Sequence, residues 1–590
     1  MSSPGDATFA GPSRSDTSVT ISPGRTVTDV LTNLEANFAP FVDGFCSARY
    51  VLWIGSGVSR DVVPGVPVLI ERVLEFVRSK IDSTDPNCPY RKAFDDILDI
   101  GSVPDGIRQT LDRTKSIDMW TDLADVLGRL DGHYADVLNV QVGTHEADYL
   151  IWEAVNAAET YGNPDLVPDA EHLCIAILMM EGVIRSAPTT NWDGLVEAAM
   201  SRLTGNATNH LRVVVLPNDL RDPDARPELV KFHGCAVLAT RNESTYRPRL
   251  VARSYQIASW NSRTDNQLMK NRLSELFTTC SALFVGLSAQ DANIQSFFSQ
   301  GIEDLSRSWP HTPPAVVFAE ETLRHNHELV LQVAYGDGFS ANKADIEASA
   351  LLGAYAKPVL IALVLVVLSE KLCVWIEVAL DGLLPPDQVE RIRADLRSLC
   401  HRVGALADAD PRAFVESFAA LVSFVLTVFR TGGTPDPDKV DYRPLSSFPA
   451  TETNLHPDFP ALAFGRLGVA LSLLGRGSAE GRWGLFPGSP ASPSDGVFRV
   501  ARGRDVSRVF IVSDSRALSQ LQASAVIDPR DSDVVVMLAE APEAPAIRSP
   551  RSVFGRIGVL TARQVDLENM CSMVGTADEL LDTFSLAAAF

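Results

Sequence analysis

Paired cysteines are absent from this sequence. The eight cysteines are scattered along 590 residues, and no two of them form a Cys-x-x-Cys pair. This spacing excludes the usual zinc ribbon and argues against a disulfide framework, because both need clustered cysteines. The pattern favours a reducing compartment, and we expect a cytoplasmic protein.

An apolar signal segment is also missing near the amino terminus. Residues up to about Thr26 are rich in Ser, Thr, Pro and Gly. Such a composition cannot bury enough apolar surface to fold on its own. We predict that residues 1–28 form a disordered leader.

Basic residues and long hydrophobic runs are scarce as well. The 52 Lys and Arg residues are outnumbered by 74 Asp and Glu residues. Phosphate binding over a large surface needs clustered Lys and Arg, so we expect no direct nucleic-acid binding, although local basic patches are compatible with this balance. The most apolar run, Val359–Leu368, has ten residues, too few to span a bilayer. It predicts a core or interface helix and no membrane association.

Six short apolar runs alternate with helical stretches and predict the fold class. A chain of this length should divide into about three or four domains. Strands that alternate with helices indicate an α/β fold with a Rossmann-like, doubly wound parallel sheet, whose ligand lies beyond the carboxyl ends of the strands. The predicted strands are residues 50–54, 186–190, 212–216, 229–232, 282–285 and 315–318.

The remaining segments complete the predicted domain organisation. Residues 29–330 form the sheet domain, with a helical insertion at about 81–185. Residues 331–430 carry no strand signal and predict a helical module. Residues 431–440 contain enough Gly and Pro to form a linker, and residues 441–590 predict a smaller carboxyl-terminal α/β domain that serves as a partner or sensor domain.

A glycine turn follows the first predicted strand. A strand that leads through glycines into a helix lets backbone N–H groups approach a phosphate closely, and the helix amino terminus adds partial positive charge. Pro67 suits the first turn of that helix. The turn lacks the third glycine of the GxGxxG fingerprint, so a plain tight turn is the alternative. The candidate cradle for a diphosphate consists of Gly55, Ser56, Gly57, Val58 and Ser59.

Three further motifs fall where other strands should end. They are Thr190-Asn191-Trp192-Asp193, His233-Gly234 and Gly286-Leu287-Ser288. Together with the glycine turn, and in this order, they resemble the SIR2 (sirtuin) superfamily, and more narrowly the SIR2-like NAD-hydrolysing effectors of bacterial antiphage defence. The resemblance covers about residues 45–320.

The resemblance implies NAD as substrate and assigns roles to these residues. Asn191 would orient ribose and water, because an amide donates and accepts hydrogen bonds, and His233 would act as the base, because it titrates near neutrality. Asp193, the third predicted catalytic residue, would steady the loop or a ribose hydroxyl. Thr190 and Pro67 would line the pocket, and Gly286 with Ser288 would line its adenosine side. The alternatives are a helix cap for Asn191 or Asp193 and a core position for His233.

Two departures from the protein-deacylating sirtuins are visible. Those enzymes carry Asp-Phe-Arg after Gly-Ile-Pro and a module of four zinc-binding cysteines. Here Val68-Leu69-Ile70 follows Pro67, and the only cysteines between Gly57 and Asn191 are Cys88 and Cys174. The resemblance therefore implies NAD cleavage without an acyl-lysine acceptor and without zinc. We predict no other metal site, and we interpret His325, His327 and Glu328 as a solvent-exposed helix face.

The resemblance also implies a biological role. We expect an NAD hydrolase that depletes NAD in infected cells and stays inactive until a partner or signal assembles it. The alternatives are a sensor that binds NAD or ADP-ribose without turnover, and an ADP-ribosyltransferase. Expected partners are further copies of the chain and an HerA-type ATPase, before a short Argonaute. The sequence leaves the choice between an ATPase partner and a ligand sensor open.

Overall fold

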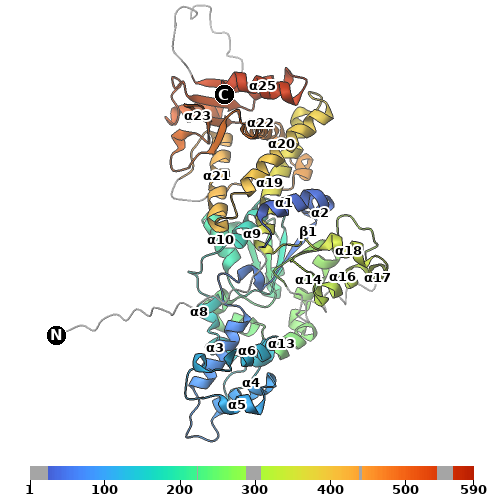
Figure 1. Ribbon diagram of the computed structural model, residues 1–590, viewed down its shortest axis with the longest axis vertical. Helices are drawn as coiled ribbons and strands as arrows, with labels where there is room; N and C mark the ends of the chain where they lie inside the picture. Colours follow the sequence, from blue (N-terminus) through green and yellow to red (C-terminus); the bar gives the residue numbers. More distant parts are fainter. Residues whose placement is uncertain (1–23, 222–223, 288–306, 437–440, 541–561) are drawn as a thin grey trace, which may run out of the picture.

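The structure is a computed structural model, and it describes residues 24–221, 224–287, 307–436, 441–540 and 562–590. Figure 1 shows how the parts follow one another along the long axis of the molecule. A central sheet lies in the middle. Helices that include α3 (Val66–Ser79) and α6 (Leu123–Leu130) lie at one end, and the carboxyl-terminal region lies at the other.

The described residues form a central sheet of six strands. Their order across the sheet is β3-β4-β2-β1-β5-β6, and every neighbouring pair is parallel. The predicted α/β fold with a Rossmann-like parallel sheet is therefore confirmed. The strands are β1 (Tyr50–Ile54), β2 (Ser186–Thr189), β3 (Arg212–Val214), β4 (Glu228–Lys231), β5 (Ser281–Val285) and β6 (Val316–Ala319).

Alternate residues of the strands enter two separate hydrophobic layers. On β1, Leu52 and Ile54 belong to one layer, whereas Val51 and Trp53 belong to the other. Successive side chains of a strand point to opposite faces, so the sheet is covered on both sides. The first layer contains residues of α1 (Val27–Asn37), α2 (Ala39–Cys46), α9 (Ala170–Met180), α10 (Leu195–Thr204) and α19 (Ala356–Leu380). The second contains residues of α14 (Gln267–Thr279), α16 (His325–Tyr335), α17 (Gly338–Ala341) and α18 (Lys343–Ala350).

The helices that follow β1 have a hydrophobic cluster of their own. Phe94 and Trp120 pack edge to face in it, with ring centroids 5.9 Å apart. The cluster extends from Ile70 to Ala157 along this part of the chain. Helix α9 does not join it, because its side chains are buried in the first layer of the sheet. Besides α3 and α6, the insertion contains α4 (Pro89–Ile100), α5 (Asp105–Thr110), α7 (Tyr134–Leu138) and α8 (Ala157–Tyr161).

The most apolar run of the sequence lies inside α19, which has 25 residues. The argument that this run is too short to span a bilayer was therefore wrong, because a helix of this length and mean hydropathy 2.5 could cross one. Burial supports the core position instead, since 89% of its most apolar window is buried inside the protein. A second helix that meets the same length and hydropathy criteria, α21 (Pro411–Thr431), is half buried.

The carboxyl-terminal region is a smaller α/β unit, as predicted. Its sheet has the order β11-β10-β9-β8-β7, in which β9, β10 and β11 are parallel and β7 and β8 run antiparallel to their neighbours. The strands are β7 (Gly484–Pro487), β8 (Phe498–Arg502), β9 (Asp505–Val512), β10 (Val534–Leu538) and β11 (Arg563–Asp566). The helices are α22 (Ala461–Ala479), α23 (Ser515–Ala523), α24 (Leu567–Ser572) and α25 (Ala577–Ala588).

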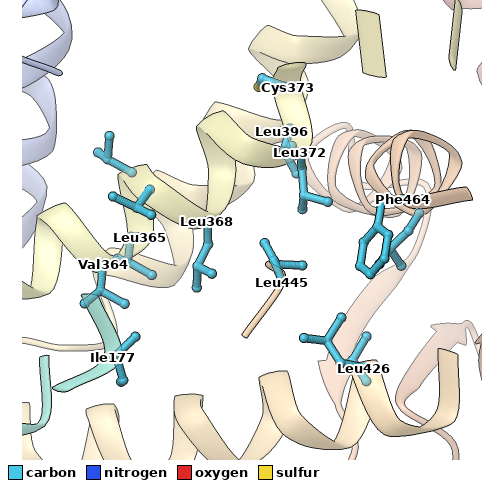
Figure 2. Close-up of a cluster of buried hydrophobic side chains, with 14 of the residues drawn as sticks. Ile177, Val364, Leu365, Leu368, Leu372, Cys373, Leu396, Leu426, Leu445 and Phe464 are labelled. Atoms are coloured by element: carbon cyan, nitrogen blue, oxygen red, sulfur yellow. The ribbon is translucent and has the colours of Figure 1, made fainter. Parts of the chain in front are cut away.

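One hydrophobic core joins this unit to the central sheet. Figure 2 shows Val364 and Leu365 of α19 near Ile177 of α9, and Leu372 further along α19 on the side of Phe464 of α22. Helix α22 approaches α19 so closely that a Cβ at Gly465 would lie 2.1 Å from the carbonyl oxygen of Trp375. A helix that is apolar on all sides must be covered on all sides. The core therefore continues past the linker, through α19 and α20 (Pro386–Gly404).

The interpretation of His327 as a solvent-exposed residue was wrong. His327 is fully buried, and its ring lies 4.7 Å from that of Phe318 on β6. Its Nδ1 accepts a hydrogen bond from the backbone N–H of Arg324, at the start of α16. Burial lowers the pKa of His327. The residue therefore packs α16 onto the second face of the sheet.

Candidate functional site

The predicted site residues follow three neighbouring strands at the carboxyl edge of the sheet. Ile54 of β1 pairs with Thr189 of β2, and Thr189 pairs with Lys231 of β4. Asn191 and His233 each lie two residues beyond the Thr189–Lys231 pair. The loops that carry them are bonded to each other, because Ala236 N donates to Trp192 O over 2.9 Å. The structure thus places Asn191 and His233 in adjacent loops at the same edge.

The hydroxyl group of Ser59 connects the glycine turn to the Asn191 loop. Ser59 is buried, and its Oγ accepts a hydrogen bond from Asn191 Nδ2 at 3.2 Å and donates one to Asp193 Oδ2 at 3.0 Å. Asn191 Nδ2 also donates to the carbonyl oxygen of Gly55 at 3.2 Å. These bonds fix the amide plane of Asn191 against the turn.

His172 is a member of this network that the sequence analysis missed. Its Nε2 lies 3.1 Å from Ser59 Oγ, and its Nδ1 accepts from the backbone N–H of Asp169 at 3.2 Å. Because Nδ1 accepts, Nε2 carries the proton and donates to Ser59. Burial lowers the pKa of His172, so the ring stays neutral near pH 7. The sequence marks His172 only as a histidine near the start of a mostly apolar helix, three residues after a capping Asp, and gives no sign of its contact with Ser59.

Asp193 acts inside the loop rather than at the cap position of the next helix. Its Oδ1 accepts from the backbone N–H of Leu195 at 3.1 Å, while Gly194 occupies the cap position of α10. Beneath it, the buried ammonium of Lys231 donates to the backbone carbonyl of Asp193 and to Glu197 Oε1, the latter at 2.7 Å. This charged support orders the loop that carries Asn191, and the sequence analysis did not identify it.

His233 is buried beside Phe232, whose ring centroid lies 4.7 Å away. The carbonyl oxygen of His233 accepts from Val251 N at 3.0 Å, and Gly234 follows in the left-handed region with φ +93°. A Cβ at Gly234 would lie 2.6 Å from the carbonyl oxygen of Arg249. The His-Gly pair therefore fixes the backbone of the loop after β4.

The other predicted residues differ in exposure. Thr190 is half-buried after β2. Pro67 is exposed in the first turn of α3, where it was predicted. In the glycine turn Ser56 is exposed, whereas Val58 is buried in the first layer. Ser288 lies outside the described residues.

The glycines of the turn are needed by backbone packing between β1 and β5. A Cβ at Gly55 would lie 2.4 Å from the carbonyl oxygen of Gly286, and a Cβ at Gly57 would lie 2.8 Å from its Cα. Gly57 N donates to Gly286 O at 2.9 Å. Gly286 itself has φ +62°, a conformation that other residues rarely adopt. The turn after β1 and the turn after β5 are therefore in backbone contact, at the point where the strand order reverses.

Replacing Gly286 by alanine is expected to lower the free energy of unfolding by about 1–3 kcal/mol, because the change adds strain at positive φ and a contact of 2.7 Å with Val58 N. Gly205 is a matched control, since it has φ +76° but open space around it. Thermal unfolding of both variants checks this. Equal losses for G286A and G205A would show that the close approach of the two turns costs nothing.

A second cluster of charges lies beside the glycine turn. Lys357 Nζ at the start of α19 contacts Asp61 Oδ2 and Asp169 Oδ2, each at 2.7 Å, and lies 3.7 Å from Glu171 Oε2. The three carboxylates are close enough to ligate a metal ion. Here an ammonium lies among them, so Lys357 supplies the positive charge. The cluster joins α19, α9 and the chain that follows Ser59.

Glu171 in this cluster gives the fold a pH dependence. Burial raises the pKa of Glu171 to about 7, whereas the pKa of a Glu in an unfolded chain is about 4.3. Between these values the folded chain keeps a proton that the unfolded chain has lost, so stability falls as the pH rises, by up to about 3 kcal/mol for this group. We expect E171Q to gain melting temperature relative to wild type between pH 5 and pH 8. A difference between the two proteins that does not change with pH would contradict this.

Comparison with known proteins agrees with this geometry. A family model described as a SIR2-like domain matches residues 185–336, which extend from β2 into α16 and include Asn191, His233 and Gly286. A search of curated proteins gave no match. Strand β1 and its glycine turn precede the matched segment but pair with β2 and β5 in the same sheet. SIR2-like domains are in general NAD-dependent enzymes, and such a domain implies NAD binding or use. The chain therefore contains a SIR2-like domain, which supports its place in the SIR2-like superfamily.

Proposed function

We propose that the chain is an NAD hydrolase that cleaves the nicotinamide–ribose bond. The contact between Asn191 and the glycine turn carries this proposal. Both donor bonds of the Asn191 amide go to the turn, while its Oδ1 atom is buried and accepts no hydrogen bond from the described residues. A buried acceptor without a donor is costly unless a ligand or water fills the role. A ribose hydroxyl or the attacking water is a donor of the required kind.

The residues divide the chemistry between them. The C–N bond to ribose breaks and its electron pair leaves with nicotinamide. The oxygen of water then bonds to the ribose carbon, and the water loses a proton. Asn191 Oδ1 orients the ribose or the water, and His233 takes the proton. Ser59, His172 and Asp193 hold Asn191 in position without contacting the substrate.

Water rather than acyl-lysine as acceptor is supported by the segment after Pro67. Val68, Leu69 and Ile70 are part of α3, and Ile70 is buried in the core of the insertion. The two cysteines of this region also lie in separate parts of the fold, which supports a site without zinc. Cys88 precedes α4 in the insertion, and Cys174 is buried within α9 under the sheet.

The experiment is direct. Purified full-length chain is incubated with NAD, with and without candidate activators, and the products are separated by chromatography. We expect equal amounts of nicotinamide and ADP-ribose. Unchanged NAD under all conditions would contradict the proposal, and tight NAD binding by calorimetry without turnover would favour a sensor. ADP-ribosylated protein in the mass spectrum would indicate an ADP-ribosyltransferase.

We further propose that NAD depletion serves antiphage defence in the cytoplasm, and that assembly gates it. The support is the resemblance of the motifs and the extent of the chain outside the sheet, which hydrolysis alone does not need. Homo-oligomers, an HerA-type ATPase or, less directly, a short Argonaute are the proposed partners. Size-exclusion chromatography with light scattering tests the first of these, and a strict monomer under active conditions would exclude self-assembly.

A further inference from the structure

A large cavity lies at the opposite edge of the central sheet from Asn191. Its volume is about 1060 Å³. The amino-terminal residues of β2, β3 and β4 form one side of it, and residues at the end of α9 and residues 441–447 form others. This volume matches the pockets that bind small molecules of nucleotide size, and it is too small for a nucleic-acid duplex.

Arginine dominates the lining of this cavity. Six arginines and His210 face three carboxylates among its described residues. Such an excess is notable in a chain whose net charge is −22. The arginines are Arg185, Arg212, Arg226, Arg272, Arg430 and Arg443, and the acids are Asp224, Glu228 and Asp441.

The three carboxylates do not balance these charges. Asp224 is engaged by Arg226, and Asp441 by Arg443 at 3.1 Å. Within the lining, Glu228 remains for Arg212, at 3.0 Å, and for Arg272. Outside it, Glu275 contacts Arg272 at 3.0 Å and Glu452 contacts Arg185 at 2.5 Å. The side chains of Glu228 and Arg212 are only 9% and 12% exposed, whereas that of Glu275 is 58% exposed and its charge is screened by solvent. The buried part of the cluster therefore holds two guanidinium groups against one carboxylate.

Arg430 forms no ion pair with a carboxylate among the described residues, and the nearby Glu181, which acts on it electrostatically, is already paired with Lys371. Its Nη2 donates to the carbonyl oxygens of Pro444 at 2.7 Å and Leu445 at 2.9 Å. Carbonyl groups orient a guanidinium but do not cancel its charge. Arg212 can donate further hydrogen bonds, because its buried Nη1 atom makes none with the described residues. A buried charge without a counter-charge, or a buried N–H group without an acceptor, lowers the stability of the fold unless an anion binds to it.

We propose that this cavity binds a small molecule that carries a chain of phosphates. Guanidinium groups bind phosphate oxygens with paired N–H donors, and several of them together suit a ligand with more than one negative charge. Arg212 and Arg272 share one buried carboxylate, Glu228, and Arg430 is held by carbonyl groups, so an anion would add the acceptors that these groups lack. This site is separate from the NAD site, and the proposal does not depend on NAD cleavage.

A ligand in this cavity would lie beside two segments that lead to other parts of the fold. Tyr442, from its lining, donates its hydroxyl proton to the buried Glu181 at 2.7 Å, next to α19. Strand β2 begins in the lining at Ser186 and ends at Thr189, two residues before Asn191. A bound anion would therefore contact both the segment that leads to the carboxyl-terminal sheet and the strand that leads to the predicted catalytic loop.

Isothermal titration calorimetry with inorganic tripolyphosphate on the full chain tests the proposal. We expect one site per chain, and a Kd at least about tenfold weaker in R185Q/R443Q and in R272Q, since the loss of one charge-assisted hydrogen bond weakens binding by at least that factor. Arg185 and Arg443 are 59% and 46% exposed, so their replacement should leave the fold intact. R129Q/R263Q is the matched control, because these exposed arginines lie outside the cavity lining, and its Kd should stay within about twofold of wild type.

Further probes separate the source of the anion and the two sites. ATP that binds at least as tightly as tripolyphosphate, with adenosine not binding, supports a phosphate-chain ligand of nucleotide type, and tripolyphosphate tighter than ATP supports a free polyphosphate. Saturating NAD should not displace tripolyphosphate. Absence of saturable binding, equal affinity in the cavity variants and wild type, displacement by NAD, or citrate binding as tightly as tripolyphosphate would each overturn the proposal.

Discussion

Replacing Lys371 by methionine is expected to lower the free energy of unfolding by about 3–5 kcal/mol. Lys371 and Glu181 form an ion pair at 2.6 Å, and their side chains are 1% and 0% exposed. Without the ammonium, Glu181 would be a buried charge that has lost its ion-pair partner. That is among the costliest single changes a folded chain can undergo.

The pair lies where three parts of the fold meet. Lys371 Nζ on α19 also donates to the carbonyl oxygens of Glu181, at the end of α9, and of Ser446, after the linker. Glu181 Oε1 accepts from the Tyr442 hydroxyl at 2.7 Å and from Leu445 N at 3.0 Å. Burial lowers the pKa of Lys371, although Glu181 opposes this shift. The ion pair therefore fixes the relative positions of α9, α19 and the segment after the linker, and adds little net stability.

A double variant separates the two effects. K371M/E181Q removes both charges, while the amide oxygen of the new glutamine would still accept from Tyr442 and Leu445, so we expect it to recover much of the stability that K371M loses. K343M is the matched control, because Lys343 is 48% exposed in its pair with Glu328, and we expect a loss below about 1 kcal/mol. The chain has several cores, so hydrogen exchange of α9 and α19 is read alongside the melting temperature. A K371M protein as stable as K343M would contradict the argument.

The central sheet was predictable because most of its strands are short apolar or β-branched runs bounded by turn residues, although β2 reads Ser-Ala-Pro-Thr. Strands buried on both faces read as continuous apolar runs, and that is how Tyr50–Ile54 and Ser281–Val285 appear in the sequence. Strands β7 and β8 were missed for the opposite reason. Phe486 and Arg499 are exposed on them, and Gly484 and Pro487 bound β7, so neither strand has a periodic apolar face.

The candidate site was predictable only where motifs end strands. Asn191 and His233 could be placed because each follows a strand of the same parallel sheet. His172 and Lys231 could not, because their roles depend on contacts with Ser59 and Asp193 across more than 30 residues of chain. Likewise, the sequence indicated an apolar helix at Val359–Leu368 but not that α19 would be covered on one side by α9 and on another by α22. Tertiary contacts of this kind leave no local pattern.

Replacing Asn191 by alanine is expected to lower kcat for NAD hydrolysis by at least about a hundredfold, because misplacing a reacting group by about 1 Å has an effect of that size. The change removes Oδ1, the buried acceptor that makes no hydrogen bond with the described residues, and both bonds to the glycine turn. N191D keeps an oxygen but loses the N–H donors to Gly55 and Ser59. It should therefore be impaired as well, and the KM for NAD should change much less than kcat in both variants.

Ser59 distinguishes positioning from direct contact. Its hydroxyl holds Asn191, Asp193 and His172 but faces inward, so S59A should loosen Asn191 and lower kcat by about tenfold, less than N191A. The double variant S59A/N191A should be no slower than N191A, because Ser59 acts through the amide that is already gone. S244A is the control, since its exposed hydroxyl donates to Asn242 Oδ1, outside this network. If S59A and N191A instead multiplied their losses, Ser59 would have to touch the substrate itself, and the turn would be the diphosphate cradle that the sequence predicts.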